Sequence, residues 1–255
     1  MKSLPAFVFT LLLAILASCC PPKTAARLPA LMDETVAITD EDGDMHCAGV
    51  WVAQDKILTA GHCVADLGLD HLEALLRSMQ EPEERTPWSP VGQTAHWKTD
   101  KDLQGGTDTK SGGPPRKGVV IKYNEDDDLA LISVETKESH PVATLRAKPV
   151  QAGEEVSLIG HPLGFQWSFT HGYVSLPSAK IPADVGTSKV DSYRLQLDGA
   201  INHGNSGGGA FDMNGELVGI CSFGTTRASG LGWYVGQDII RNFLTTCTAS
   251  ACGVP

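Results

Sequence analysis

The hydrophobic positions of this chain come mostly in short runs, alternating or continuous, that turn residues separate. Seven runs have the length and β-branched content of strands, and they cover residues 34–39, 45–52, 56–59, 119–123, 129–134, 156–160 and 172–176. Residues 40–44, between the first two, contain the Asp-Gly pair that is typical of hairpin turns. Many short strands at regular spacing predict an all-β architecture of two closed barrels, in which closure removes the unpaired edges.

Two other segments repeat apolar residues at helical spacing, and they cover residues 66–79 and 236–246. We expect the first to be an amphipathic helix and the second to be the C-terminal helix. Residues 80–118 are instead rich in Pro, Glu, Thr, Gly and Lys, which predicts a flexible surface insertion. Such an insertion is either a lid beside a cleft or a plain linker.

The N-terminus has the layout of an export signal. Residues 1–18 contain one lysine, then the run AFVFTLLLAILA and small residues, which is typical of a secretory signal peptide and short for a membrane span. Leu16 to Cys19 also resemble a bacterial lipobox, in which Cys19 is lipidated; ordinary cleavage nearby is the alternative. We therefore expect a bacterial periplasmic or cell-envelope lipoprotein, or else a secreted protein, with residues 19–32 as a tether and residues 33–250 as the folded domain.

Composition excludes some partners. The chain has 255 residues, of which 42% are hydrophobic and 20% charged, as in a soluble globular protein. Its formal net charge of -10 argues against nucleic-acid binding, because no basic stripe is present to neutralise phosphates. The same charge gives little attraction to anionic lipid, so we expect membrane contact only through the lipid anchor.

Several glycines lie close to one serine in the sequence. Gly204-Asn205-Ser206-Gly207-Gly208 fits G-x-S-x-G, whose sharp turn leaves a hydroxyl and its neighbouring amides exposed. Glycine, serine and asparagine also favour ordinary surface turns. The motif alone does not decide between a nucleophile and a turn.

Two further segments bear on this choice. His62 in LTAGHCV and Asp128 in DDDLALISV precede Ser206, which gives the order His, Asp, Ser. All eight histidines precede Ser206, which excludes an α/β-hydrolase, where the histidine follows the serine. A subtilisin-type order needs an aspartate before His62, and the acids of residues 33–44 fit a turn better. The order that remains is that of trypsin-like serine proteases.

Longer motifs point the same way. TAGHC, DLALI and GNSGG resemble the motifs of the trypsin/chymotrypsin clan, and QLDGAINHGNSGG, SLIGHPLG and GELVGI resemble its bacterial HtrA/Deg branch, over about residues 34–246. The resemblance implies two six-stranded antiparallel β-barrels of the trypsin-like type with a C-terminal helix. It also selects Asp128, directly before the apolar run, over Asp126 and Asp127. We expect no PDZ domain after the helix, and we expect a monomer.

The resemblance implies a role for each site residue. His62 is the general base and acid, Asp128 orients it, and Ser206 forms an acyl-enzyme with polypeptide substrates. The backbone amides of Gly204 and Ser206 form the oxyanion hole, where one donor is worth roughly 2.7 to 4 kcal/mol. No cofactor or metal is needed. Asn205 stands where trypsin zymogens have an aspartate, so we expect no N-terminal activation cleavage.

The same resemblance outlines a substrate pocket. Its floor falls on Ala200 with Ile201 beside it, its rim on His203, and its walls on Ser222, Gly224 and Gly232. No charge lies at the base, which favours small or medium apolar side chains over lysine and arginine. His203 is either a selector of acidic side chains or a plain solvent-facing residue.

Export permits disulfides. The resemblance pairs Cys47 with Cys63 as the histidine-loop disulfide of trypsin-like enzymes, although HtrA enzymes usually lack it. Cys247 and Cys252 are candidates for a small C-terminal loop, Cys20 has no assigned partner, and we expect Cys221 to be a buried thiol. The acids of residues 40–44 do not fit an EF-hand, and the His-Cys pairs fit no zinc spacing, so we expect no metal site.

Two alternative functions remain at this point. One is a binding protein that keeps the protease fold without activity, although the intact motifs argue against it. The other is an esterase that uses the same three residues on small acyl substrates.

Overall fold

The structure, a computed structural model, describes residues 23–69, 73, 88–99, 102, 114–181, 192–224 and 230–246. Several sequence predictions lie outside this part of the chain: the signal peptide, the Cys19 lipidation site, most of the helix expected over residues 66–79, and Cys20, Cys247 and Cys252. The rest can be compared with the structure.

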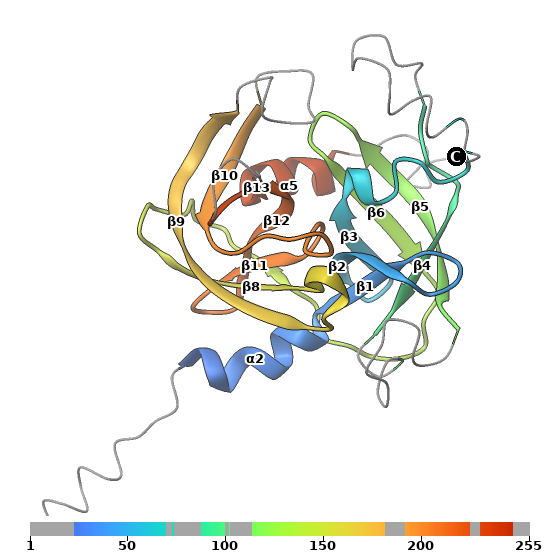
Figure 1. Cartoon of the computed structure of the whole chain (residues 1–255), viewed down its shortest axis with the longest axis horizontal. Helices are drawn as coiled ribbons and strands as arrows, with labels where there is room; N and C mark the ends of the chain where they lie inside the picture. Colours follow the sequence, from blue (N-terminus) through green and yellow to red (C-terminus); the bar gives the residue numbers. More distant parts are fainter. Residues whose placement is uncertain are drawn as a thin grey trace, which may run out of the picture.

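The first half of the chain closes into an antiparallel barrel, on the right of Figure 1. Its strands are β1 Thr35–Thr39, β2 Met45–Ala53, β3 Lys56–Ala60, β4 Thr94–Lys98, β5 Arg116–Asn124 and β6 Leu129–Val134. They pair in the order β1-β2-β3-β6-β5-β4, and β4 pairs back with β1. Trp51, Trp97 and Ile132 belong to the apolar core that fills this barrel.

The second half forms another barrel, on the left of Figure 1. Its strands are β8 Glu155–Gly160, β9 Ser168–Ile181, β10 Ser192–Asp198, β11 Gly209–Asp212, β12 Glu216–Gly224 and β13 Leu231–Gly236. The order β11-β8-β9-β10-β13-β12 closes through the pairing of β11 with β12, and β7 (Thr144–Leu145) adds to β12 in parallel. The short 3₁₀ helices η1 (Gly61–Cys63) and η3 (Pro162–Gly164) and the C-terminal helix α5 (Gln237–Thr245) complete the domain.

The prediction of two closed barrels with a C-terminal helix is confirmed. The prediction of one surface insertion over residues 80–118 is wrong in part, because β4 and the start of β5 lie inside it. Trp97 of β4 is only 1% exposed and packs edge-on against Trp51. A five-residue strand in a stretch dominated by polar residues, Pro and Gly carries too weak a pattern to be recognised.

The predicted tether also differs from the structure. Helix α2 (Lys23–Asp33) covers most of residues 19–32, and Figure 1 shows it leading directly into β1. Leu31 is 3% exposed within a core cluster that includes Trp167, and Trp167 Nε1 donates to the carbonyl of Met32 at 3.0 Å. The end of this segment therefore belongs to the folded domain. No helix in the described ranges has the length and apolar character needed to cross a membrane.

Candidate active site

His62 lies on η1, the turn that follows β3. The turn packs so closely on the first-barrel strand β6 that a Cβ at Gly61 would lie 3.0 Å from the backbone nitrogen of Leu129. The backbone N–H of His62 donates to Asp128 Oδ1 at 2.8 Å, and its Nδ1 is 3.0 Å from both carboxylate oxygens. This contact presents the imidazole with Nδ1 on the aspartate and Nε2 directed elsewhere.

Asp128 is buried directly before β6, with 5% of its surface exposed. Besides His62 it accepts a hydrogen bond from the hydroxyl of Ser222 at 2.5 Å. The neighbouring Asp127 instead bonds the side chain of Asn124 within the turn, which agrees with a structural role for that acid. The sequence patterns assigned Ser222 to the pocket wall and gave no signal for its contact with Asp128.

Ser206 lies where the two barrels meet. Its carbonyl accepts from the backbone N–H of Ala48 in β2 at 2.7 Å. A Cβ at the next residue, Gly207, would lie 2.1 Å from the Ala48 carbonyl and 2.2 Å from Thr59 Oγ1, so a side chain there would push the barrels apart. The Ser206 hydroxyl donates to the carbonyl of Ser222 at 3.5 Å. Ser222 thus touches Asp128 through its hydroxyl and Ser206 through its carbonyl.

The peptide that joins His203 to Gly204 has a fixed orientation. The carbonyl of His203 accepts from the backbone N–H of Leu163 at 2.7 Å, and the carbonyl of Gly204 accepts from His161 at 3.1 Å. In a trans peptide the carbonyl and the N–H point in opposite directions. Because the carbonyl of His203 points to Leu163, the N–H of Gly204 points away from Leu163. Gly204 has φ +96°, and a Cβ there would lie 2.1 Å from the His161 carbonyl, so glycine is required.

The loop against Gly204 is anchored by a buried histidine. His161 is fully buried; its Nδ1 accepts from the backbone N–H of Trp167 at 3.1 Å, and its Nε2 lies 3.3 Å from the carbonyl of Val36. Burial lowers the pKa of His161 to about 4, and the contact with Val36 opposes this. The neutral imidazole can therefore act as acceptor and donor at once. Asn205 packs on the same loop, because a Cβ at Gly160 would lie 2.5 Å from its Oδ1.

The pocket differs from the expected arrangement in one respect. Ile201, rather than Ala200, reaches between the walls, because a Cβ at Gly232 would lie 2.0 Å from its Cδ1 and one at Gly224 would lie 3.2 Å from its Cγ2. Ala200 is exposed, and its carbonyl accepts from Asn205. His203 is also exposed. Ile201 therefore shortens the space between the two glycine walls.

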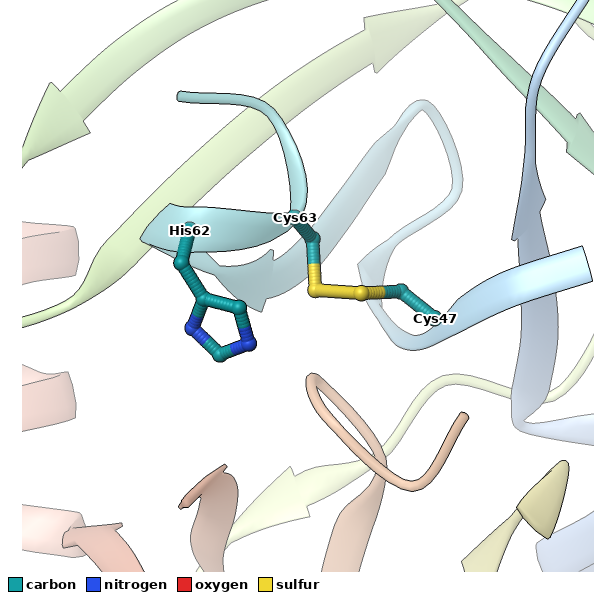
Figure 2. Close-up of side chains that lie close together, drawn as sticks. All are labelled: Cys47, His62 and Cys63. Atoms are coloured by element: carbon teal, nitrogen blue, oxygen red, sulfur yellow. A yellow bond between two sulfur atoms is a disulfide. The ribbon is translucent and has the colours of Figure 1, made fainter. Parts of the chain in front are cut away.

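A disulfide joins Cys47 of β2 to Cys63 of η1, directly beside His62 (Figure 2). The two sulfurs and a ring nitrogen of His62 lie within 4.8 Å of one another, a distance that suits a shared metal ion. The sulfurs are bonded to each other, however, and a metal site needs thiolates. This cluster is therefore a cross-link next to the imidazole. Cys221 is a buried free thiol, and burial raises its pKa to about 12.

Removing the disulfide is expected to destabilise the first barrel. The cross-linked residues are 16 positions apart, and closing a loop of this size in the unfolded chain is worth about 3 kcal/mol. We expect the Cys47→Ala/Cys63→Ala double variant to lose about 2 to 4 kcal/mol in the free energy of unfolding, measured by denaturant titration. Wild-type protein under reducing conditions should lose a similar amount. A loss below about 0.5 kcal/mol would contradict the expectation.

Comparisons with known proteins identify the family. Residues 47–220 match the model of the trypsin-like peptidase domain. The chain is 35% identical over 134 residues to bovine mitochondrial serine protease HTRA2, covering 52% of this chain and 28% of the relative. It is 27% identical over 223 residues to the chloroplastic Protease Do-like 5 of Arabidopsis thaliana, covering 85% and 62%. The chain thus spans less than a third of the length of the first of these relatives.

Solved structures share the fold. The active form of the Rv3671c protease from M. tuberculosis superimposes with a TM-score of 0.63 at 15% identity, covering 92% of this chain and 88% of the other. A serine endoprotease from Yersinia pestis gives 0.62 at 18% identity, covering 88% and 66%. The two docked barrels are the fold of these two-barrel structures. The chain belongs to the trypsin-like peptidase domain family, with HtrA-type proteases among its relatives.

Proposed function

We propose that this chain is a serine endopeptidase that cleaves polypeptides through His62, Asp128 and Ser206. The observation that carries the proposal is the buried Asp128 carboxylate, which contacts His62 twice and Ser222 once, while Ser222 also contacts Ser206. This network brings together residues from both barrels at the inter-barrel junction. An arrangement of this kind is what activation of a serine by a histidine requires.

The mechanism follows from the contacts. The carboxylate of Asp128 accepts the Nδ1 proton of His62, so that Nε2 is free to take the proton of Ser206. The hydroxyl leaves the Ser222 carbonyl and turns to the imidazole when substrate binds, as catalytic hydrogen bonds commonly tighten in the complex. The serine oxygen attacks the peptide carbonyl, and the amides of Gly204 and Ser206 stabilise the oxyanion. His62 then protonates the leaving amine, and water releases the acyl group by the same steps.

The pH dependence should report His62. Burial lowers its pKa, but the charge of Asp128 and the hydrogen bond to it together outweigh burial and raise the pKa above 6.5. Protonated His62 cannot accept the serine proton, so kcat/KM should fall as pH drops through this raised value. A profile of kcat/KM between about pH 5 and 9 should therefore show an acid limb with its midpoint above 6.5. A midpoint clearly below that value would contradict the role of Asp128.

Ile201 supports a preference for small apolar residues before the cleaved bond. It fills part of the space between Gly224 and Gly232, and the other described atoms nearest these two positions belong to Leu231 and Tyr234. We expect a peptide library to be cut after alanine, valine and similar residues. Ile201→Ala should shift the preference toward larger side chains such as leucine and phenylalanine, by about 10- to 100-fold in relative kcat/KM. An unchanged preference would mean that Ile201 does not line the pocket that binds the residue before the cleaved bond.

The library also tests the function as a whole. Serine-dependent peptide cleavage, absent in Ser206→Ala, supports the endopeptidase. Ester turnover without peptide turnover would favour the esterase, and absence of both together with no labelling by a fluorophosphonate probe would favour a binding protein. Cleavage after glutamate would assign the selecting role to the exposed His203.

A further inference from the structure

The turn before Asp128 concentrates negative charge. Residues 125–128 are four consecutive acids between β5 and β6, and the last of them is buried. Burial raises the pKa of Asp127; Arg194 opposes this rise, and Asp126 adds to it. Neighbouring carboxylates repel one another, and the repulsion grows where water is excluded. A positive charge close to this turn therefore stabilises its carboxylates.

Arg194 supplies that charge from the other barrel. It lies on β10, and its side chain is buried, with 2% of the residue exposed. Its Nη2 donates to the carbonyl of Asp126 at 2.9 Å, and its Nη1 donates to the carbonyl of Tyr193 at 3.3 Å. Burial lowers the pKa of Arg194, while the charges of Asp128 and Asp127 oppose this. A guanidinium is rarely buried without partners, and here its partners across the inter-barrel junction are the Asp126 carbonyl and the charges of Asp127 and Asp128.

The backbone of Asp128 needs external support. Its φ is +54°, a left-handed conformation that is uncommon for residues other than glycine and that persists only when its surroundings enforce it. His62 and Ser222 hold the side chain of Asp128. Arg194 holds the carbonyl of Asp126, two residues earlier in the same turn.

We infer that Arg194 is a positioning residue, which fixes the turn that presents Asp128 to His62 and supplies the positive charge beside that carboxylate. The inference rests on the proposed function, because the turn matters for catalysis only if Asp128 orients His62. The two hydrogen bonds of Arg194 described above go to the carbonyls of Tyr193 and Asp126, and neither acceptor is the reacting serine or a pocket glycine. It acts through the geometry and the field of the aspartate turn.

The charge of Arg194 has a measurable consequence. The charged and titratable groups around the turn are its four acids, Glu125 to Asp128, together with Arg194 on β10, His62 on η1, and Cys221 with Tyr234 on the second barrel. Burial keeps the thiol of Cys221 and the phenol of Tyr234 neutral by raising the pKa of each. Loss of the Arg194 charge therefore leaves the field of the carboxylates uncompensated at His62. Protonation of His62 becomes easier, and the acid limb of kcat/KM moves to higher pH.

The test compares Arg194→Met, Arg194→Lys and Arg194→Gln in the full chain. In the methionine variant we expect kcat to fall about 10- to 100-fold with little change in KM, and the acid limb to rise by about 0.5 to 1 pH unit. The lysine variant retains the positive charge but lacks the planar guanidinium group. The acid limb of kcat/KM should therefore return to its wild-type position, while kcat recovers only in part. Glutamine retains a donor for the Asp126 carbonyl without the charge, and its limb should move as in the methionine variant.

Arg146→Met is the matched control. Arg146 directly follows β7 and pairs with Glu154 and Asp212 rather than with the aspartate turn, so its loss should lower stability without moving the acid limb. If Arg194→Met does not fold, the acid limb and kcat of Arg194→Gln provide the test. A folded, uncharged Arg194 variant with the wild-type limb and kcat would overturn the inference. A wild-type protein without serine-dependent cleavage would overturn the proposed function instead, so the two failures are distinguishable.

Discussion

Ser206→Ala is expected to lower kcat for peptide hydrolysis by about a millionfold. The methyl group of alanine cannot attack the peptide carbonyl, so no acyl-enzyme forms. In a Ser-His-Asp triad, loss of the serine alone lowers kcat about as much as loss of all three residues. The carbonyl of Ser206 accepts from the backbone N–H of Ala48, and an alanine keeps this contact. The hydroxyl donates to the carbonyl of Ser222, and an alanine loses only this side-chain contact. The fold should therefore survive the change.

The measurement is single-turnover cleavage of a peptide taken from the library, with fluorophosphonate labelling alongside. Ser175→Ala, a change on β9 of the second barrel, is the control that should leave both readouts unchanged. Residual cleavage about 10³- to 10⁴-fold above the uncatalysed rate agrees with stabilisation by the oxyanion hole and substrate binding alone. Activity within tenfold of wild type in Ser206→Ala would show that another residue is the nucleophile.

Asp128→Asn should have the second largest effect, a fall of about 10⁴ in kcat. The carboxylate accepts from the backbone N–H of His62, from its Nδ1 and from the hydroxyl of Ser222. An amide has one acceptor oxygen and one donor nitrogen, so its NH₂ group would face a ring nitrogen or a hydroxyl that is itself a donor. The imidazole would then adopt the tautomer with the proton on Nε2, which cannot take the serine proton.

Asp127→Asn is the matched control for this change. It removes one negative charge from the same turn, but Asp127 bonds Asn124 rather than His62. We expect it to change kcat less than tenfold. Equal losses in the two variants would mean that the charge of the turn, rather than the contact with His62, determines activity.

The sequence predicted those parts of the site that depend on local backbone geometry. Gly61, Gly204 and Gly207 each lie where a Cβ would collide with a neighbouring backbone atom or side chain, which is why these short motifs carry so much information. The two barrels were predictable because many strands are short apolar runs between turn residues, and β1, β3 and β8, for example, are buried along nearly their whole length.

The parts that the sequence did not predict depend on contacts between distant segments. Ser222 and Asp128 are 94 positions apart, and the contact of Arg194 with Asp126 spans 68. No local pattern encodes either pair, because both arise only when β10 and β12 dock on the other barrel. The position of the Ile201 side chain between Gly224 and Gly232 likewise depends on segments that are distant in the sequence. Strand β4 was missed because its five residues are surrounded by polar sequence.

The two barrels come from consecutive halves of the chain. Strands β1 to β6 build the half that carries His62 and Asp128, and strands β8 to β13 build the half that carries Ser206. Neither half contains a complete catalytic set. A break in the connection between β6 and β8 is therefore expected to separate the three proposed catalytic residues, so that cleavage would require the two fragments to bind each other; this dependence is what a split-enzyme sensor uses.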